Sequence, residues 1–288
     1  MAQKGQTNRL TTQHLANHGV DGIFGELAKK HDGNVGVIAG LAVKKLEKDF
    51  PGLQFRHRMS MRKSEINDKL KTIDDYLGQV LFLPQAEIRP DGGLIEVLDD
   101  NSEWRVILVT EAKYQGKDIE NVSQGVLVGK NKDQDLMAAG NAIERSHKNV
   151  REIANFMLGE QHFPYILFLE GSNFLTETIS VVRPDGREVT LHYDSGSLNR
   201  IDRLTAVNYS MPINTNLCEN RVVTSKGQAI MLQAASLYTQ GKGGAWDGAD
   251  MLAIMIEVAT TSIKVLASDL FNQMVLKSEE EEADDEGR

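Results

Sequence analysis

Apolar positions along the chain follow two different spacings, which divide it into helical and extended segments. Spacings of three and four residues predict a short helix near Asn199 and longer helices over residues 35–50, 64–77, 133–158 and 247–276. Runs rich in β-branched residues predict a hairpin over residues 181–193 and strands over residues 79–83, 94–98, 103–111, 164–169 and 229–238. Strands interleaved with helices favour an α/β fold, in which a mixed sheet lies between helical layers.

The composition fits one large domain with polar extensions. Of the 288 residues, 41% are hydrophobic, and neither an internal repeat nor a long linker divides the chain. We expect a single domain over residues 1–277 that includes a polar arm over residues 1–16, followed by an acidic, disordered tail over residues 278–288. Residues 279–288 account for −6 of the net charge of −9, and the remainder is still mildly acidic. Any nucleic-acid cleft must therefore concentrate its basic residues locally.

Two features indicate the compartment. The sequence contains no apolar run of the roughly 18 residues that a membrane span needs, and its first residues lack the apolar core of a signal peptide. The single cysteine, Cys218, has no partner for an internal disulfide, which is typical of a thiol in a reducing compartment. We therefore expect a cytoplasmic protein.

Three charged residues, Asp91, Glu111 and Lys113, are predicted to meet at one end of a hairpin. If residues 94–98 pair antiparallel with residues 103–111 about Asn101, Asp91 lies directly opposite Glu111. Opposed Cβ atoms are about 5 Å apart, a separation at which two carboxylates can share one divalent cation. Lys113 follows Glu111 by two residues and shares its face of the strand. This set predicts a Mg²⁺ site with a lysine that can stabilise charge on a phosphate.

The tetrapeptide Arg-Pro-Asp-Gly occurs twice, at residues 89–92 and 183–186, so the chain contains its own comparison. The motif alone is typical of a turn, and we assign Asp185 to one. Glu-Ala-Lys follows across a hairpin after the first copy and not after the second. An acid followed at a loose distance by Glu-x-Lys also arises among ordinary surface charges. The pattern by itself therefore leaves a nuclease site and a charged surface both open.

Longer segments carry a resemblance to one enzyme family. Pro90-Asp91 with Glu111-Ala112-Lys113 resembles the motif of the PD-(D/E)XK nucleases. More specifically, the EcoRI family of restriction endonucleases is similar over the segments EAKYQGKDI, LVGKNKDQDLMAAGNAIERSHKN, IANFML, HFPYILFLEGSNFLTE, LNRIDRLTA, MPINTNLC and IMLQAASLYTQG. The resemblance runs from about Asn8 to the C-terminal helix, which is nearly the whole chain.

This resemblance implies a type II restriction endonuclease from the bacterial cytoplasm, a homodimer whose mixed five-stranded sheet is flanked by helices. Its implied substrate is double-stranded DNA with the palindrome GAATTC, cut after the G in both strands to leave 5′-phosphate ends, with Mg²⁺ as cofactor. By the same resemblance Asp91 and Glu111 bind the metal ion and Lys113 assists the attack of water. A cognate adenine methyltransferase belongs to the same implied system.

The resemblance also implies which residues read the DNA bases. These are Met137, Ala138, Ala139, Gly140, Asn141, Ala142, Glu144, Arg145, Arg200 and Arg203. Asparagine suits the edge of adenine, arginine suits the edge of guanine, and methionine and alanine can contact thymine methyl groups. Contacts to the DNA backbone are expected from Arg89, Lys117, Lys130 and Lys148. Without the family, the same pattern fits an ordinary solvated helix face.

The start of the helix that carries these residues is open to two interpretations. The periodicity of apolar residues predicts that the helix begins near Asp133, whereas the family resemblance implies that residues 137–141 form an extended strand. Gly140 disfavours a helix start, so we expect the extended form. The sequence departs from the family at Gln85-Ala86-Glu87, where fewer hydroxyl groups precede Arg89, and at Tyr114, where a histidine is expected.

Two other functions stay open. The same catalytic core serves repair and recombination nucleases, which recognise DNA structure instead of sequence. An inactive descendant, in turn, would bind DNA without cutting it. The presence of Asp91, Glu111 and Lys113 together argues against an inactive protein.

Overall fold

The computed structural model describes most of the chain. The described residues are 26–129, 131–136, 142–192, 221–225, 228–232 and 235–266, and their side chains are described except at 26–33, 142–145 and 221–232. Several predictions fall outside these residues: the polar arm, the short helix near Asn199, the C-terminal helix beyond residue 266 and the acidic tail. No helix in the described ranges is long and apolar enough to cross a membrane.

A five-stranded mixed sheet forms the centre of the molecule, with the strand order β1-β4-β5-β6-β11. The strands are β1 (Phe55–Arg58), β4 (Gly93–Leu98), β5 (Trp104–Tyr114), β6 (Tyr165–Glu170) and β11 (Ser236–Thr239). β1, β4 and β5 pair antiparallel, whereas β5, β6 and β11 pair parallel. The predicted strands over residues 94–98, 103–111 and 164–169 are confirmed, and so is the α/β fold with a mixed sheet.

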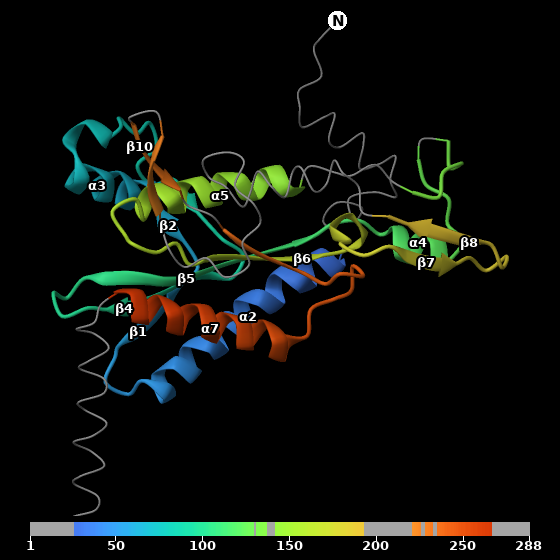
Figure 1. The fold of residues 1–288 in the computed structure, drawn as a ribbon, viewed down its shortest axis with the longest axis horizontal. Helices are drawn as coiled ribbons and strands as arrows, with labels where there is room; N and C mark the ends of the chain where they lie inside the picture. The colour runs from blue at the N-terminus through green and yellow to red at the C-terminus, as the bar shows by residue number, and fades with distance from the viewer. Residues whose placement is uncertain are drawn as a thin grey trace, which may run out of the picture.

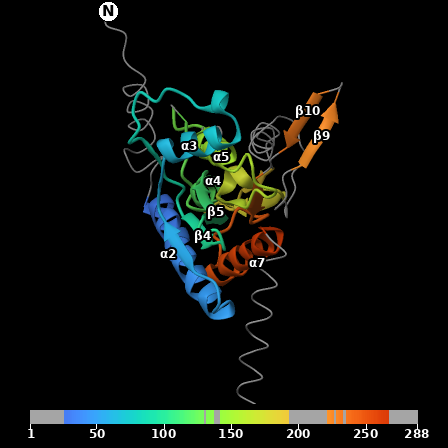
Figure 2. The same ribbon diagram turned by 90° about the vertical axis from the view of Figure 1, so that its left-hand side faces the viewer.

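Helices cover both faces of this sheet (Figures 1 and 2). α2 (Glu26–Asp49) and α7 (Gly248–Leu266) lie on one face, and α3 (Lys63–Ile73) and α5 (Ala142–Phe156) lie on the other. Each face buries its own apolar cluster, because each helix turns one apolar stripe toward the strands. The predicted helices over residues 35–50 and over the described part of 247–276 are confirmed. The helix predicted over residues 64–77 is confirmed up to Ile73, after which residues 75–77 form a 3₁₀ turn.

Smaller elements surround this core. The predicted hairpin over residues 181–193 is confirmed as β7 (Ile179–Val182) and β8 (Glu188–Leu191), which lie beside α4 at one end of the molecule in Figure 1. The others are β2 (Met61–Arg62), β3 (Glu87–Ile88), α4 (Asp118–Ser123), β9 (Arg221–Ser225), β10 (Gln228–Leu232) and the 3₁₀ turns η2 (Asp75–Leu77) and η3 (Ser172–Phe174).

A β-bulge in β5 reverses the alternation of its side chains. Ile95 pairs with Leu108 and Glu96 pairs with Val106, so Ile107 is an extra residue on β5. Ile107 and Leu108 both face the α2/α7 cluster, whereas Val106 and Val109 both face the α3/α5 cluster. Beyond the bulge, odd-numbered residues of β5 therefore face α3 and α5. This shift places Glu111 and Lys113 on that face of the sheet.

The predicted register of this hairpin is wrong for the same reason. Pairing about Asn101 holds next to the turn, where Leu98 lies opposite Trp104. After the bulge the register moves by one residue, so that Gly93 lies opposite Thr110. Asp91 precedes β4 in a turn and is not paired with Glu111 across the hairpin. Any meeting of these residues must therefore come from their side chains.

Three other segments differ from their predicted structure. Residues 79–83 form no strand, and Val80 and Phe82 are 90% and 97% exposed, because an apolar run extends as a strand only where a partner strand pairs with it. The run 229–238 is divided between β10, paired with β9, and β11 of the central sheet. The helix that periodicity predicts from Asp133 is not formed over residues 133–136, because the backbone of Gln134 is paired with Val128, and α5 is described from Ala142 onward. The extended form that we expect for residues 137–141 lies outside the described residues.

Candidate active site

The first Arg-Pro-Asp-Gly copy forms a tightly packed turn that carries Asp91 to the centre of the sheet. Gly92 N donates to Thr110 O of β5 at 2.9 Å, and a hydrogen bond of 2.8 Å joins His57 Nε2 of β1 to Gly92 O. A Cβ at position 92 would lie 1.9 Å from Thr110 Oγ1, so the close approach requires glycine. A Cβ at Gly93, whose φ is +74°, would lie 2.3 Å from Arg58 O. The turn is therefore fixed between two strands.

Three oxygen atoms converge on the ammonium group of Lys113. Lys113 Nζ lies 2.8 Å from Glu111 Oε1, donates to Ala112 O at 2.8 Å, and forms an ion pair with Asp91 Oδ2. Asp91 is held from the backbone as well, because Ala112 N donates to its Oδ2 at 3.2 Å. The structure thus brings together the three residues that the sequence predicted to meet, although their register differs.

These oxygen donors fit a small divalent cation. Two carboxylates and a backbone carbonyl already surround one positive charge, and hard oxygen ligands of this kind suit Mg²⁺ with water completing its shell. Within the described residues, no three side chains of His, Cys, Asp or Glu gather as a metal site. The protein donors that the structure shows at this site are two carboxylates and one carbonyl.

The electrostatics of the site are dominated by burial. Glu111 is 1% exposed, and burial raises the pKa of its carboxyl against the attraction of Lys113. Burial alone would lower the pKa of Lys113, but the attraction of Glu111 and Asp91 outweighs this effect and raises that pKa. Lys113 is therefore charged. A cation placed among these oxygens stabilises the ionised form of Glu111.

Two further residues contact Glu111 and were not predicted. The hydroxyl of Tyr165, in β6, donates to Glu111 Oε2, and Asn149 Nδ2, in α5, donates to the same oxygen at 3.2 Å. Burial and the charge of Glu111 raise the pKa of Tyr165 well above its usual value, so its hydroxyl keeps its proton. One signal was present in the sequence, since Tyr165 places a hydroxyl in the otherwise apolar run PYILFL.

The second Arg-Pro-Asp-Gly copy confirms the turn that was predicted for Asp185. Asp185 Oδ1 accepts from Arg187 N at 3.0 Å, and Gly186 has a φ of +84° with open space around it. Arg183 is buried and donates to Asp135 and to Gly125 O. The two copies share a sequence, but the first packs its aspartate against the central sheet and the second closes a surface hairpin.

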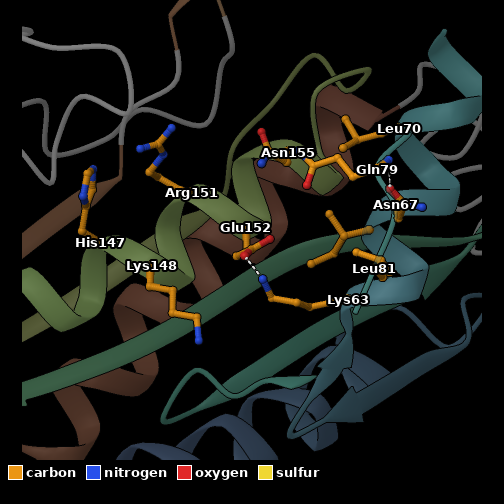
Figure 3. A pocket seen from close by; sticks show the side chains of 11 residues that line it. Lys63, Asn67, Leu70, Gln79, Leu81, His147, Lys148, Arg151, Glu152 and Asn155 are labelled. Atoms are coloured by element: carbon orange, nitrogen blue, oxygen red, sulfur yellow. Dashed lines mark hydrogen bonds and ion pairs between the residues drawn. The ribbon is translucent and has the colours of Figure 1, made fainter. Parts of the chain in front are cut away.

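Three of the backbone-contact candidates, Arg89, Lys117 and Lys148, lie within the described residues. Arg89 is exposed and pairs with Glu87 at 2.8 Å, and Lys117 precedes α4. Lys148 of α5 lines a cleft of roughly 450 Å³ between α3, α5 and residues 79–81 (Figure 3). His147 and Arg151 also line this cleft, whereas the ammonium of Lys63 is paired with Glu152 at 2.5 Å. This side of α5 is therefore basic.

The base-recognition candidates are described only in part. Ala142, Glu144 and Arg145 lie in the first turn of α5, but their side chains are outside the described set. The remaining candidates lie wholly outside the described residues, as does one backbone candidate: Met137, Ala138, Ala139, Gly140, Asn141, Arg200, Arg203 and Lys130. Their roles stay predictions.

Comparison with known proteins identifies the family. The family described as Restriction endonuclease EcoRI matches residues 17–273. The chain is 61% identical over 277 residues to the type II restriction enzyme EcoRI of Escherichia coli, which covers 96% of this chain and 100% of that protein. It is 52% identical over 267 residues to the type II restriction enzyme RsrI of Cereibacter sphaeroides, which covers 93% and 96%.

The fold and these similarities define the class of the protein as a site-specific deoxyribonuclease. More particularly, the chain belongs to the EcoRI family of type II restriction endonucleases.

The packing of the Asp91 turn can be tested with a matched pair of substitutions. Gly92→Ala forces a methyl group into Thr110 and is expected to lower the free energy of unfolding by about 3 kcal/mol. Gly186→Ala, at the same position of the second copy, meets open space and is expected to cost about 1 kcal/mol through its positive φ. Urea unfolding of both variants gives the comparison, and equal losses would contradict the described packing.

Proposed function

We propose that this chain recognises GAATTC in double-stranded DNA and, with Mg²⁺, hydrolyses one phosphodiester bond in each strand to leave 5′-phosphate ends. The observation that carries the proposal is the convergence of Asp91, Glu111, Lys113 and the Ala112 carbonyl at one point of the central sheet. Membership of the EcoRI family supports the substrate, because the sequence resemblance implies this palindrome.

Asp91, Glu111 and the Ala112 carbonyl are the proposed metal ligands. A bound Mg²⁺ supplies two effects, polarisation of the scissile phosphate and a lowered pKa for an attacking water. The protein contributes the fixed positions of the two carboxylates, one held by a glycine turn and the other by a central strand. Attack of water in line with the P–O3′ bond would break that bond, so that the water oxygen stays on the 5′-phosphate, a proton passes to the departing 3′-oxygen to give a hydroxyl, and no covalent bond to the protein forms.

Lys113 provides a positive charge from the protein itself. Its ammonium lies among the same oxygens that are proposed to bind the metal ion, so it is close to where the phosphate must lie. Its three donors are directed at Asp91, Glu111 and the Ala112 carbonyl, and a donor released when these oxygens bind the metal ion would bond a phosphate oxygen. The proposed role of Lys113 is to stabilise the negative charge that grows on the phosphate during attack.

Base recognition is proposed for the segment that leads into α5. The amide of Asn141 suits the edge of adenine, and Met137 and the alanines suit thymine methyl groups. The guanidinium groups of Arg145, Arg200 and Arg203 suit guanine, and the carboxylate of Glu144 can accept from a base amino group. α5 begins at Ala142, and its basic side carries Lys148 next to the cleft. With Arg89, Lys117 and Lys130, this side is proposed to bind the phosphate backbone, which offsets the acidic net charge locally.

The symmetry of the substrate supports a homodimer. A palindrome presents the same bases to two protomers related by a two-fold axis, and one site in each protomer then cuts one strand. An enzyme that cuts GAATTC also endangers the DNA of its own host. We therefore include in the proposal a bacterial cytoplasmic location and a cognate adenine methyltransferase that protects this sequence.

The substrate can be tested with two plasmids, one that carries a single GAATTC and one that lacks it. With 10-fold steps of Mg²⁺, we expect the first plasmid to become linear and the second to stay intact, with no reaction when the metal is chelated. Gel electrophoresis reads the result, and sequencing of the ends locates the cut. Cutting of both plasmids would favour a structure-specific nuclease, and binding without cutting would favour an inactive descendant.

The site residues can be tested with the two aspartates of the repeated tetrapeptide. Asp91→Asn and Glu111→Gln remove negative charge from the proposed ligands and are expected to lower the cleavage rate by about 100-fold or more. Binding to GAATTC without metal should persist in both. Asp185→Asn keeps an oxygen acceptor for its turn and should cut at the normal rate. Normal cleavage by Asp91→Asn would refute the proposed site.

The oligomeric state can be measured without DNA. Sedimentation velocity at micromolar concentration is expected to give a species of twice the chain mass of 31.9 kDa. A monomer at that concentration and in the presence of a GAATTC duplex would contradict the two-fold arrangement.

A further inference from the structure

The two carboxylate oxygens of Glu111 have different surroundings. Oε1 lies 2.8 Å from Lys113 Nζ and faces the side of Asp91. Oε2 accepts from the hydroxyl of Tyr165 and, at 3.2 Å, from Asn149 Nδ2. The carboxylate is thus bound on one oxygen by neutral donors and presents the other oxygen to positive charge.

We infer that Tyr165 is a positioning residue for the divalent cation, because its hydroxyl holds Oε2 and so directs Oε1 of Glu111 toward the metal ion. The inference rests on the proposed function, since that function makes Glu111 a metal ligand. Asn149 is a second donor to Oε2 from a different element, α5. Tyr165 and Asn149 together hold the carboxylate of Glu111, one from the neighbouring strand β6 and the other from the helix α5.

Tyr165 itself has almost no freedom to move. It is fully buried at the start of β6, where it pairs with Val109, and its ring stacks on Phe163 with 5.9 Å between centroids. Leu167, and not Tyr165, lies opposite Glu111 in the parallel ladder. Val109 lies two residues before Glu111 in β5, so the tyrosine ring extends along the sheet face over that distance to bring its hydroxyl to the carboxylate.

A phenylalanine would fill most of this space without carrying a polar atom into the core. Burying a hydroxyl costs free energy unless the hydroxyl is hydrogen-bonded. The hydrogen bond to Glu111 therefore offsets the cost of burying the hydroxyl of Tyr165. A carboxylate held by such a donor loses less orientational freedom when it binds a cation. Outer hydrogen bonds of this kind typically change metal affinity by about 10- to 100-fold.

The chain offers a matched control in Tyr114. Its hydroxyl donates to Glu120 Oε1 at 3.0 Å, so it makes the same phenol–carboxylate contact, but that carboxylate is outside the site. Tyr114→Phe and Tyr165→Phe each remove one oxygen atom. A general loss of stability would affect both variants, whereas a positioning role would affect the cation in Tyr165→Phe alone.

The test is a Mn²⁺ titration of the full-length protein without DNA, with free Mn²⁺ followed by electron paramagnetic resonance. We expect Tyr165→Phe to weaken Mn²⁺ binding by about 10- to 100-fold and Tyr114→Phe to change it by less than about two-fold. Asn149→Ala, which removes the other donor to Oε2, should weaken it by about three-fold or more. Urea unfolding of each variant shows that the protein is folded during the titration.

Each outcome decides between named alternatives. Unchanged Mn²⁺ affinity in Tyr165→Phe, with weakened binding in Asp91→Asn, would overturn the positioning role and leave the proposed site intact. Unchanged affinity in Asp91→Asn would overturn the metal site and with it this inference. If Tyr165→Phe does not fold, Asn149→Ala decides, because an unchanged affinity there would show that donors to Oε2 do not control the cation.

Discussion

One extra residue in β5 determines where the candidate site can exist. Without the bulge at Ile107, the alternation of the strand would turn Glu111 and Lys113 toward α2 and α7. The carboxylate and the ammonium would then lie in an apolar cluster, at a cost of several kcal/mol for each charge. The bulge turns them instead toward the face where the Asp91 turn, α5 and Tyr165 supply partners.

The buried charges on this face are stabilised by ion pairs and hydrogen bonds with residues from different parts of the chain. Lys113 forms ion pairs with two carboxylates, and the neutral donors of Tyr165 and Asn149 bind the oxygen of Glu111 that Lys113 does not reach. The free-energy cost of burying such a network is small while all its polar groups are paired, and it is large when one member is lost.

Much of this fold follows from the local pattern of the sequence. The parts that do not follow from it were missed for physical reasons that can be identified. The strands β4, β5 and β6 and most of the four large helices were predictable from spacing, whereas β1 was not predicted and α2 and α5 begin at residues that spacing did not give. Spacing also predicted that Asp91, Glu111 and Lys113 meet, although the predicted register of the hairpin was wrong. The bulge was not, because Ile107, Leu108 and Val109 are all apolar and leave no mark of a change in register. Tyr165 and Asn149 were missed because they lie 54 and 38 residues from Glu111, and only packing brings them together.

The position of Asn149 on α5 also has a mechanical consequence. The helix begins at Ala142, directly after the segment proposed to read the bases, and Asn149 follows two turns later, about 10 Å along the axis. A helix is stiff over that distance, so its first turn and Asn149 move as one body. In the proposed function, a displacement of the DNA-reading end would therefore also change the contact between Asn149 and Glu111. In the proposed function, one helix, α5, therefore both reads the DNA sequence and holds the carboxylate of Glu111.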